Sequence, residues 1–256
     1  MQKIIISGCC GHMGRVVADI CASDPDTDVA AGIDLLPQPM EGFPVFSTPA
    51  ACPVEADAVI DFSHPAALGP LLDFCVERKL PVVLATTGYS EEQLGQIRGA
   101  AGSIPIFRSA NMSLGINVLM DLAARASALL GGDFDVEIEE RHHRRKLDAP
   151  SGTALMLADA AASALPYEPE YVYDRHSTRK PRERREIGIA SLRGGTIVGD
   201  HTVVFAGRDE VIEITHRAAS REVFAAGAVK AAKFLTGVNE PGLYDMSHLI
   251  AGKEDI

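Results

Sequence analysis

Short apolar runs alternate with helix-like segments through the first half of the chain. The run KIIIS at residues 3–7 leads into a glycine-rich segment and then into the helical pattern of residues 15–24. The same succession of strand and helix recurs as far as residue 109, which predicts a parallel, doubly wound α/β sheet of the Rossmann-like kind. Ligands bind such sheets at the carboxyl ends of the strands. Three polar corners fall at these ends: residues 61–65, 85–88 and 109–113.

The pattern changes after an apolar helix that begins near Leu114 and ends at Gly131 and Gly132. Four segments with strand-like alternation follow, which predicts an open, mostly antiparallel sheet in a smaller α+β domain. One helix, from about Thr153 to Ala164, is inserted between these strands, and Ser151 is its expected N-cap. The four strand segments are residues 134–143, 186–195, 201–207 and 211–218.

Two domains account for the two patterns. Residues 1–113 are expected to form a dinucleotide-binding domain, completed by the C-terminal segment 222–256, whose helix near 224–235 precedes an apolar tail. Residues 114–221 are expected to form the second, smaller domain. The basic segment 175–185 fits a mobile or interface loop, although a solvated run of charge is the simpler interpretation.

Composition narrows the range of partners. The chain has 256 residues, of which 46% are hydrophobic, and no apolar run approaches the ~20 residues of a membrane span. The N-terminal residues lack the apolar region of a signal peptide, so a cytoplasmic protein without a membrane partner is expected. The formal net charge of -11 argues against a nucleic-acid partner. Five cysteines without CxxC spacing favour reduced thiols: Cys9, Cys10, Cys21, Cys52 and Cys75.

A glycine loop joins the first strand to the first helix. Gly8, Gly11 and Gly14 have the spacing GxxGxxG, which suits a phosphate held against backbone N–H groups at a helix N-terminus. This spacing alone is weak evidence, since ordinary turns also use glycine. Asp34 strengthens the interpretation, because it ends a second strand about twenty residues later, where an acid that binds ribose belongs. A dinucleotide site is therefore predicted here.

The strongest chemical signal is a run of six side chains, residues 141–146, that are cationic or can become so. It follows a strand and precedes the helix N-terminus at Ser151, Gly152 and Thr153, whose N–H groups suit a carboxylate. His142 can exchange a proton near neutral pH, and Lys146 adds positive charge. An anionic substrate that takes up a proton fits this loop.

The same residues resemble a known family. EERHHRRKLDAPSGTAL, residues 139–155, is similar to the signature E-x-x-H-H-x-x-K-x-D-A-P-S-G-T of the 4-hydroxy-tetrahydrodipicolinate reductase (dihydrodipicolinate reductase) family. GCCGHMG resembles the family's GxxGRMG, DFSHP its DFTxP, ATTGYS its GTTGF, and SANMSLGINVL its AANFSxGVN. The resemblance extends in order to within about twenty residues of the C-terminus.

This resemblance implies an NAD(P)H-dependent reductase of the diaminopimelate route to lysine. Residues 114–221 would be its substrate-binding and oligomerisation domain, through whose sheet it would assemble as a homotetramer. His142 would be the catalytic proton donor and Lys146 a second donor or electrostatic stabiliser. The residues implied to bind the dicarboxylate substrate are His143, Gly152 and Thr153. Those implied to bind the dinucleotide are Gly8, Cys9, Cys10, Gly11, His12, Met13, Gly14, Asp34, Ala85, Thr86, Thr87, Ser109, Ala110, Asn111 and Met112.

Departures from the family pattern bear on the cofactor. His12 replaces an arginine, Ala85 a glycine and Met112 a phenylalanine. Asp34 favours the ribose hydroxyls of NADH over a 2′-phosphate, and Leu35 stands where NADPH-using relatives commonly have an arginine. NADH is therefore the expected cofactor, with NADPH as the second choice. Hydride transfer is expected to need closure of the two domains around the reactants.

Rival interpretations are weaker. A metal site at His142 and His143 is disfavoured, because adjacent side chains point to opposite sides of a strand and Arg141 and Arg144 would repel a cation; no metal is expected. A nucleic-acid module would need interleaved aromatic residues, and only 5% of the chain is aromatic. A non-catalytic dinucleotide sensor, or a related reductase that acts on another carboxylate, stays open.

Overall fold

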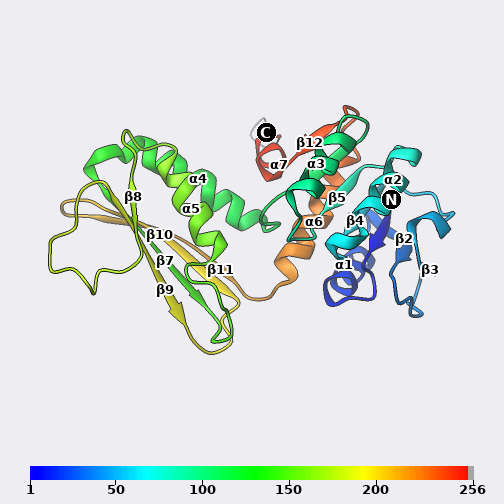
Figure 1. The fold of residues 1–256 in the computed structure, drawn as a ribbon, viewed down its shortest axis with the longest axis horizontal. Helices are drawn as coiled ribbons and strands as arrows, with labels where there is room; N and C mark the ends of the chain where they lie inside the picture. The colour runs from blue at the N-terminus through cyan, green and yellow to red at the C-terminus, as the bar shows by residue number, and fades with distance from the viewer. Residues whose placement is uncertain (253–256) are drawn as a thin grey trace. The chain divides into compact units, whose positions relative to one another are not determined.

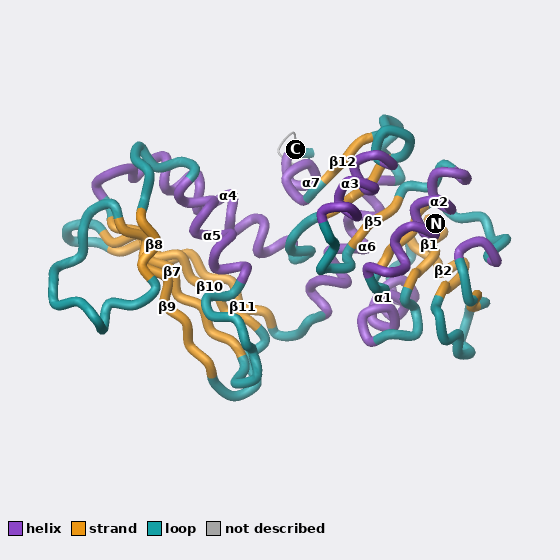
Figure 2. Tube along the Cα trace, in the orientation of Figure 1, coloured by secondary structure: helices purple, strands orange, loops and turns teal. Residues whose placement is uncertain are grey.

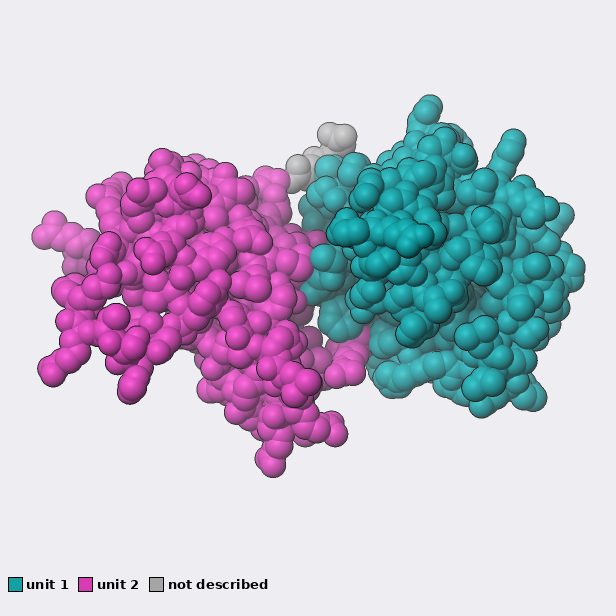
Figure 3. Space-filling model, viewed as in Figure 1, with its two compact units in different colours: residues 1–113, 222–256 teal, residues 114–221 magenta. Residues whose placement is uncertain are grey.

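The computed structural model describes residues 1–252, which divide into two compact units (Figure 3). Unit 1 comprises residues 1–113 together with the C-terminal segment that begins at Glu222, and unit 2 comprises residues 114–221. The binding roles that the sequence assigns to the two units stay predictions. Each unit has its own sheet and its own core.

Unit 1 is built on a seven-stranded sheet in the order β12-β6-β5-β4-β1-β2-β3, and every strand pair in it is parallel (Figure 1). The predicted Rossmann-like α/β architecture is confirmed for this unit. Its strands are β1 (Gln2–Ser7), β2 (Thr27–Ile33), β3 (Val45–Phe46), β4 (Ala58–Asp61), β5 (Val82–Leu84), β6 (Pro105–Arg108) and β12 (Gly242–Tyr244). Its helices are α1 (His12–Ser23), α2 (Leu68–Arg78), α3 (Glu91–Ala100), α6 (Glu222–Leu235) and α7 (Met246–Ala251), with short 3-10 turns η1 (Pro49–Ala51) and η2 (Pro65–Ala67).

Alternating side chains bury both faces of this sheet. Ile106 packs with the core that includes Leu71 of α2 and Ile97 of α3. The next residue, Phe107, points to the other face, where its ring meets the ring of Phe234 in α6 at a centroid distance of 6.2 Å. Helices therefore cover both faces, which is why the strands are continuous apolar runs.

Unit 2 contains a five-stranded sheet in the order β11-β10-β7-β9-β8. This sheet is mixed, and the prediction of a mostly antiparallel sheet is wrong in that respect. β10 pairs antiparallel with β7 and β11, but β7–β9 and β8–β9 are parallel pairs. The reason is the helix between β7 and β9, since a crossover helix returns the chain parallel to the strand it left. The strands are β7 (Asp135–His142), β8 (Glu170–Val172), β9 (Glu186–Arg193), β10 (Gly199–Ala206) and β11 (Val211–Ala218).

Two helices of unit 2 pack on its sheet: α4 (Leu114–Leu130), which ends in the 3-10 turn η3 (Gly131–Asp133), and α5 (Gly152–Ala162) (Figure 2). Leu119 of α4 and Leu157 of α5 belong to the same buried cluster as Phe205 of β10. In the described part of the chain, residues 114–133 alone are long and apolar enough to cross a membrane by length and composition. The expectation that no apolar run approaches a membrane span is therefore wrong for this segment by length and composition, and 28% of it is buried inside the protein.

The boundaries of the predicted elements are confirmed to within a few residues, but four short elements were missed. Strands β3, β8 and β12 have two or three residues each, and α7 has six. A run that short shows no periodicity of its own. The apolar tail that follows residue 240 returns to unit 1 as β12, which pairs in parallel with β6.

The basic segment 175–185 is tied to the sheet of unit 2. Arg182 lies 2.7 Å from Asp135 and 2.8 Å from Glu137, and its guanidinium also donates to the Val136 carbonyl. Arg175 pairs with Glu137 and with Glu186. Much of this positive charge is therefore neutralised by acidic residues of β7 and β9, which neither of the two sequence interpretations anticipated.

Helix α6 passes so close to the backbone of Met112 that Gly227 has no room for a side chain. A β-carbon at Gly227 would lie 1.7 Å from the Met112 carbonyl oxygen. Gly227→Ala is therefore expected to lower the free energy of unfolding by about 1–3 kcal/mol or more, as overpacking does. Urea unfolding followed by circular dichroism measures the change.

Gly95→Ala is the matched control, because Gly95 lies on the exposed side of α3, where an added β-carbon would meet only the end of the Arg98 side chain, at 4.0 Å. That variant is expected to gain about 0.4–1 kcal/mol. Equal stability of the two variants would show that α6 can shift away from Met112.

Candidate active site

The glycine loop of unit 1 is shaped by close backbone contacts. Gly8 has a φ of 78°, and a β-carbon there would lie 2.5 Å from the Phe62 carbonyl oxygen. A β-carbon at Gly14 would lie 2.1 Å from the carbonyl oxygen of Gly8. Gly11 is the N-cap of α1, so the predicted loop ends at a helix N-terminus. These three positions give the loop the shape of a phosphate cradle.

Asp34 follows directly after β2 and braces this loop. One oxygen of its carboxylate accepts a hydrogen bond from the Cys10 backbone N–H at 3.0 Å, and the other accepts from the Leu36 N–H at 3.1 Å. The side chains of Leu35 and Leu36 beside it are mostly exposed. Arg15 of α1 donates to the Cys10 carbonyl and to the side chain of Gln38, which places a guanidinium near the segment that follows β2.

A cavity of about 420 Å³ adjoins the loop within unit 1. Gly8, Gly11 and Asp34 line it, as the dinucleotide prediction requires. Phe62, Ser63 and His64, from the polar corner at residues 61–65, line it as well. The sequence did not single out the other walls, which include Ser47, Thr48, Pro49, Ala66, Ala67, Pro70 and Leu71.

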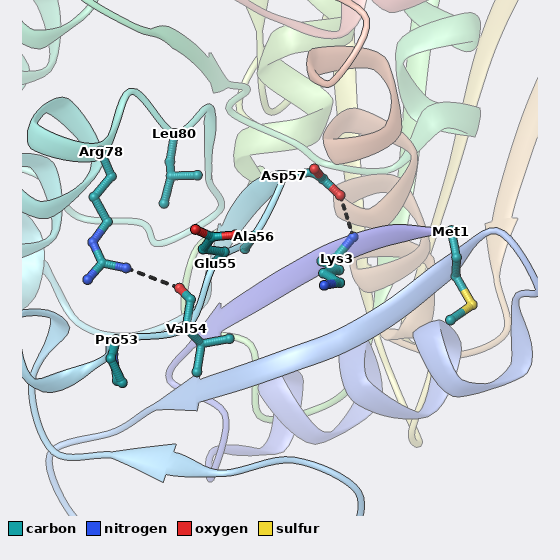
Figure 4. A pocket seen from close by; sticks show the side chains of 9 residues that line it. All are labelled: Met1, Lys3, Pro53, Val54, Glu55, Ala56, Asp57, Arg78 and Leu80. Carbon is teal, nitrogen blue, oxygen red and sulfur yellow. Dashed lines mark hydrogen bonds between the residues drawn. The ribbon is translucent and has the colours of Figure 1, made fainter.

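A larger cavity, of about 660 Å³, lies at the amino ends of the strands of the same sheet (Figure 4). It is bordered by Lys3 at the start of β1, Asp57 just before β4 and Leu80 just before β5. Figure 4 shows the Asp57 carboxylate accepting from the Lys3 N–H and Arg78 donating to the Val54 carbonyl. Ligands bind doubly wound sheets at the carboxyl ends of the strands, so the smaller cavity is the better candidate.

Of the other residues predicted to bind the dinucleotide, His12 and Met13 open α1, and the rest lie at strand ends of unit 1. Ala85, Thr86 and Thr87 follow β5, and the Thr86 hydroxyl donates to the buried carboxylate of Asp61 at 2.7 Å. The segment Ser109–Met112 follows β6, with the Ser109 hydroxyl donating to the Asn111 carbonyl. Asp61 also accepts from the Ser63 hydroxyl. It therefore holds the ends of two strands together, a role that the sequence did not reveal.

In unit 2, the basic loop is anchored by Glu140, which is fully buried near the end of β7. Arg193 of β9 donates to both oxygens of its carboxylate, at 2.6 and 2.7 Å. Burial alone would raise the pKa of Glu140, but the hydrogen bonds from Arg193 and His142 outweigh it and hold the pKa at about 2. The carboxylate is therefore ionised near neutral pH.

Glu140 also orients His142, the predicted proton donor. The Nδ1 atom of His142 lies 2.6 Å from a Glu140 oxygen, inside the sheet, and the imidazole is 7% exposed. Because an ionised carboxylate can only accept, Nδ1 carries the hydrogen, which leaves Nε2 to exchange a proton. A β-carbon at Gly199 of β10 would lie 3.0 Å from Nε2, so this glycine makes room for the ring.

The N-terminus of α5 belongs to the same cluster. Ser151 caps α5 as predicted, since its hydroxyl accepts from the Ala154 N–H, while its own N–H donates to Glu140. The Ser151 hydroxyl also lies 3.2 Å from Nε2 of His201, and the rings of His201 and His142 meet edge to face at a centroid distance of 5.1 Å. Burial and the neighbouring His142 lower the pKa of His201 from 6.5 to about 4.

The other residues predicted to act on the substrate surround this cluster. Lys146 lies 2.9 Å from Asp148 and is partly exposed. Burial and nearby cations, with Arg221 first among them, lower the pKa of His143, whose Nδ1 has no hydrogen-bond partner among the described residues. Gly152 and Thr153 open α5 directly after the Ser151 cap. The structure thus brings all five residues to one end of β7 and α5.

The sequence did not single out three members of this cluster. Glu140 was part of the quoted motif but was given no role, and Arg193 and His201 were not named. The alternation along β7 points Glu140 to the same buried face as His142, and that signal was present in the sequence. Arg193 and His201 come from strands about fifty residues away, and no local pattern links them to the loop.

The two units together have features of nicotinamide-dependent oxidoreductases. One unit has a glycine loop with a carboxylate at a strand end, and the other has an oriented histidine beside a basic loop. Family models described as dihydrodipicolinate reductase match both parts of the chain, the N-terminal model at residues 2–112 and the C-terminal model at residues 115–250. The chain therefore belongs to the dihydrodipicolinate reductase family.

Relatives of this family are similar over nearly the whole chain. The 4-hydroxy-tetrahydrodipicolinate reductase of Caldanaerobacter subterraneus subsp. tengcongensis is 54% identical over 250 residues, which is 98% of each chain. The enzyme of the same name from Clostridium tetani is 48% identical over 250 residues, 98% of this chain and 97% of that one. A dipicolinate-bound dihydrodipicolinate reductase from Paenisporosarcina sp. TG-14 has the same fold, with a TM-score of 0.80 at 23% identity, and the match covers 96% of this chain and 97% of that one.

The lowered pKa of His201 predicts a loss of stability in mild acid. Below pH 6.5 the histidine of the unfolded chain takes up a proton that the folded chain binds only near pH 4. The contribution of His201 to the free energy of unfolding is therefore complete above pH 6.5 and falls by at most about 3 kcal/mol between pH 6.5 and pH 4. Urea unfolding at a series of pH values measures this slope.

The variant His201→Asn is expected to flatten the slope between pH 6.5 and pH 4. His176→Asn, a substitution of an exposed histidine in the basic segment, is expected to leave it unchanged. An unchanged slope in His201→Asn would assign the acid sensitivity to another group.

Proposed function

We propose that the protein catalyses the NAD(P)H-dependent reduction of 4-hydroxy-tetrahydrodipicolinate to tetrahydrodipicolinate in the diaminopimelate route of lysine biosynthesis. The observation that carries this proposal is the pair of His142 and the buried Glu140, joined to the capped N-terminus of α5. That arrangement suits an anion that must take up a proton, and the chain belongs to a family of this activity.

The residues of unit 1 fit a dinucleotide. Added β-carbons at Gly8 and Gly14 would fill the cradle, and Asp34 presents its carboxylate to the adjoining cavity. Backbone N–H groups at the start of α1 would hold the pyrophosphate, and Asp34 would accept from the adenosine ribose hydroxyls. The 4-hydroxyl group would leave the substrate as water, and the reduced nicotinamide, when bound, would supply a hydride to the conjugated ring carbon.

The residues of unit 2 would bind the dicarboxylate and supply the proton. The N–H groups of Gly152 and Thr153, with the side chain of His143, would hold a carboxylate. His142 would donate from Nε2 to the substrate as negative charge develops there, and Lys146 would stabilise that charge. Glu140 would then stabilise the imidazolium as it regains a proton from solvent. The reaction needs the reactants to be brought together, so closure belongs to the proposal.

A homotetramer, acting in the cytoplasm, completes the proposal. The support for self-association is the sheet of unit 2: α4 and α5 pack on one face, and on the other face the described residues place the segment 175–185 over only the Asp135–Glu137 end of β7. Strands in parallel pairs are usually covered on both faces, and β7, β8 and β9 form such pairs here. A second copy of the chain would supply the missing layer.

The direct test measures the rate of nicotinamide oxidation. The substrate is generated in the same assay by the enzyme that precedes the reductase in the route. Wild-type protein is expected to turn over, and His142→Gln is expected to lower kcat by about 10²–10⁴-fold, the usual cost of a lost general acid. Dinucleotide binding, measured separately by calorimetry, is expected to stay unchanged.

Glu140→Gln separates orientation from proton donation. It keeps a hydrogen-bond partner for His142 but removes the charge that pairs with Arg193, so kcat and the free energy of unfolding are both expected to fall. Undiminished turnover in His142→Gln would refute the assignment. Binding of NADH without any turnover would favour a dinucleotide sensor, and turnover of another carboxylate alone would favour a related reductase.

The proposal includes a preference for one of the two nicotinamide cofactors. NADH is expected to be favoured over NADPH by about tenfold in kcat/KM, or roughly 1.4 kcal/mol, because Asp34 repels a 2′-phosphate and Leu35 carries no charge. Leu35→Arg is expected to narrow the gap by adding a guanidinium. Steady-state kinetics with both cofactors at one pH and ionic strength measure it.

Arg15 provides the control for this prediction, since it lies beside the segment that follows β2. A wild-type preference for NADPH that Arg15→Ala abolishes would contradict the prediction and assign phosphate binding to Arg15.

A further inference from the structure

Two adjacent cysteines and an acid meet at the glycine loop. The Sγ atoms of Cys9 and Cys10 lie 3.8 Å apart. One ligand atom from each of these cysteines and an oxygen of the Asp34 carboxylate all lie within 4.8 Å of one another. Cys9 is fully buried, whereas Cys10 and Asp34 are partly exposed, so the group can be reached from one side.

The sulfur separation matches metal coordination. Zinc binds thiolates at about 2.3 Å in a tetrahedron, which places two sulfur ligands about 3.8 Å apart. A disulfide is a poorer fit, since adjacent α-carbons lie about 3.8 Å apart across a trans peptide, but disulfides need about 4.4–6.8 Å. The pair is therefore placed to share a cation rather than to bond covalently.

The surroundings hold the cysteines in this position. A β-carbon at Gly32 of β2 would lie 2.5 Å from the Cys9 sulfur, so the glycine leaves room for that sulfur against the sheet. The Cys10 backbone N–H donates to Asp34, which fixes the acid beside the two thiols. A carboxylate oxygen has a second lone pair and can still bind a metal.

Zinc and cadmium bind sulfur as thiolate, so a cation that binds here displaces the thiol protons to solvent.

We propose that Cys9, Cys10 and Asp34 form a binding site for a thiophilic divalent cation of the zinc and cadmium class. This departs from the sequence expectation of no metal, which considered His142 and His143. The fourth tetrahedral position is left to water.

The cation and the dinucleotide exclude each other, because both need the Asp34 carboxylate. This step rests on the proposed function, in which Asp34 binds the adenosine ribose. Occupation of the site by the cation therefore inhibits the enzyme by blocking the nucleotide loop.

The test uses the full-length protein, reduced and free of metal. Titration with Cd²⁺ is expected to produce the ultraviolet charge-transfer band of cadmium thiolate at one equivalent, and prior loading with Zn²⁺ is expected to raise the Cd²⁺ concentration needed to produce this band. Cys10→Ala and Cys10→Ser are expected to weaken Cd²⁺ binding at least about 100-fold, more than the loss of an outer-shell partner does.

Cys75→Ala is the matched control, because it removes a buried cysteine of α2, and it is expected to bind Cd²⁺ like the wild type. Melting temperatures check that each variant folds.

Competition is measured by NADH titration with and without Zn²⁺. Zn²⁺ is expected to raise the apparent Kd of NADH in wild type and in Cys75→Ala, but not in Cys10→Ala. Cd²⁺ binding that survives both Cys10 substitutions would overturn the site. Simultaneous binding of both ligands would overturn their exclusion. Failure of NADH to bind metal-free protein, with Cd²⁺ binding intact, would support the cation site and count against the proposed function.

Discussion

The buried carboxylate of Glu140 is the constraint on which the chemistry of unit 2 depends. It is fully buried, receives two hydrogen bonds from Arg193, and accepts from Ser151 at the start of α5. One charged group thus fixes β7, β9 and α5 relative to one another. Removing one partner of such a buried pair typically costs about 3–5 kcal/mol, since the other charge is left without compensation.

The same carboxylate sets the tautomer of His142, because its contact with Nδ1 fixes which nitrogen carries the hydrogen. Burial and the nearby His142 lower the pKa of His201. The two histidines meet edge to face but have different partners: Glu140 for His142, and the Ser151 hydroxyl for His201.

Much of this arrangement could be predicted from local patterns. The glycine loop, Asp34 at the end of β2 and the Ser151 cap each depend on neighbours within a few residues or on one strand end, so the sequence shows them directly. Short apolar runs also predicted most strands of unit 1, and hydrophobic alternation predicted four strands of unit 2. The parallel pairing of β7 with β9 was missed, because alternation identifies a strand but says nothing of its partner.

Long-range pairs could not be predicted, and they decide how the basic residues are used. Arg175, Arg182 and Arg193 are all cations in the sequence, yet each is tied to a carboxylate of β7, which leaves less of their charge for a ligand. Arg144 and Arg145 are exposed in the loop beside His142. The chain, with a net charge of -11, therefore keeps local positive charge where the proposed substrate binds and neutralises it elsewhere. An anion approaching the loop meets a field set by a few residues, and the overall charge of the protein contributes little at that range because salt screens it within about 8 Å.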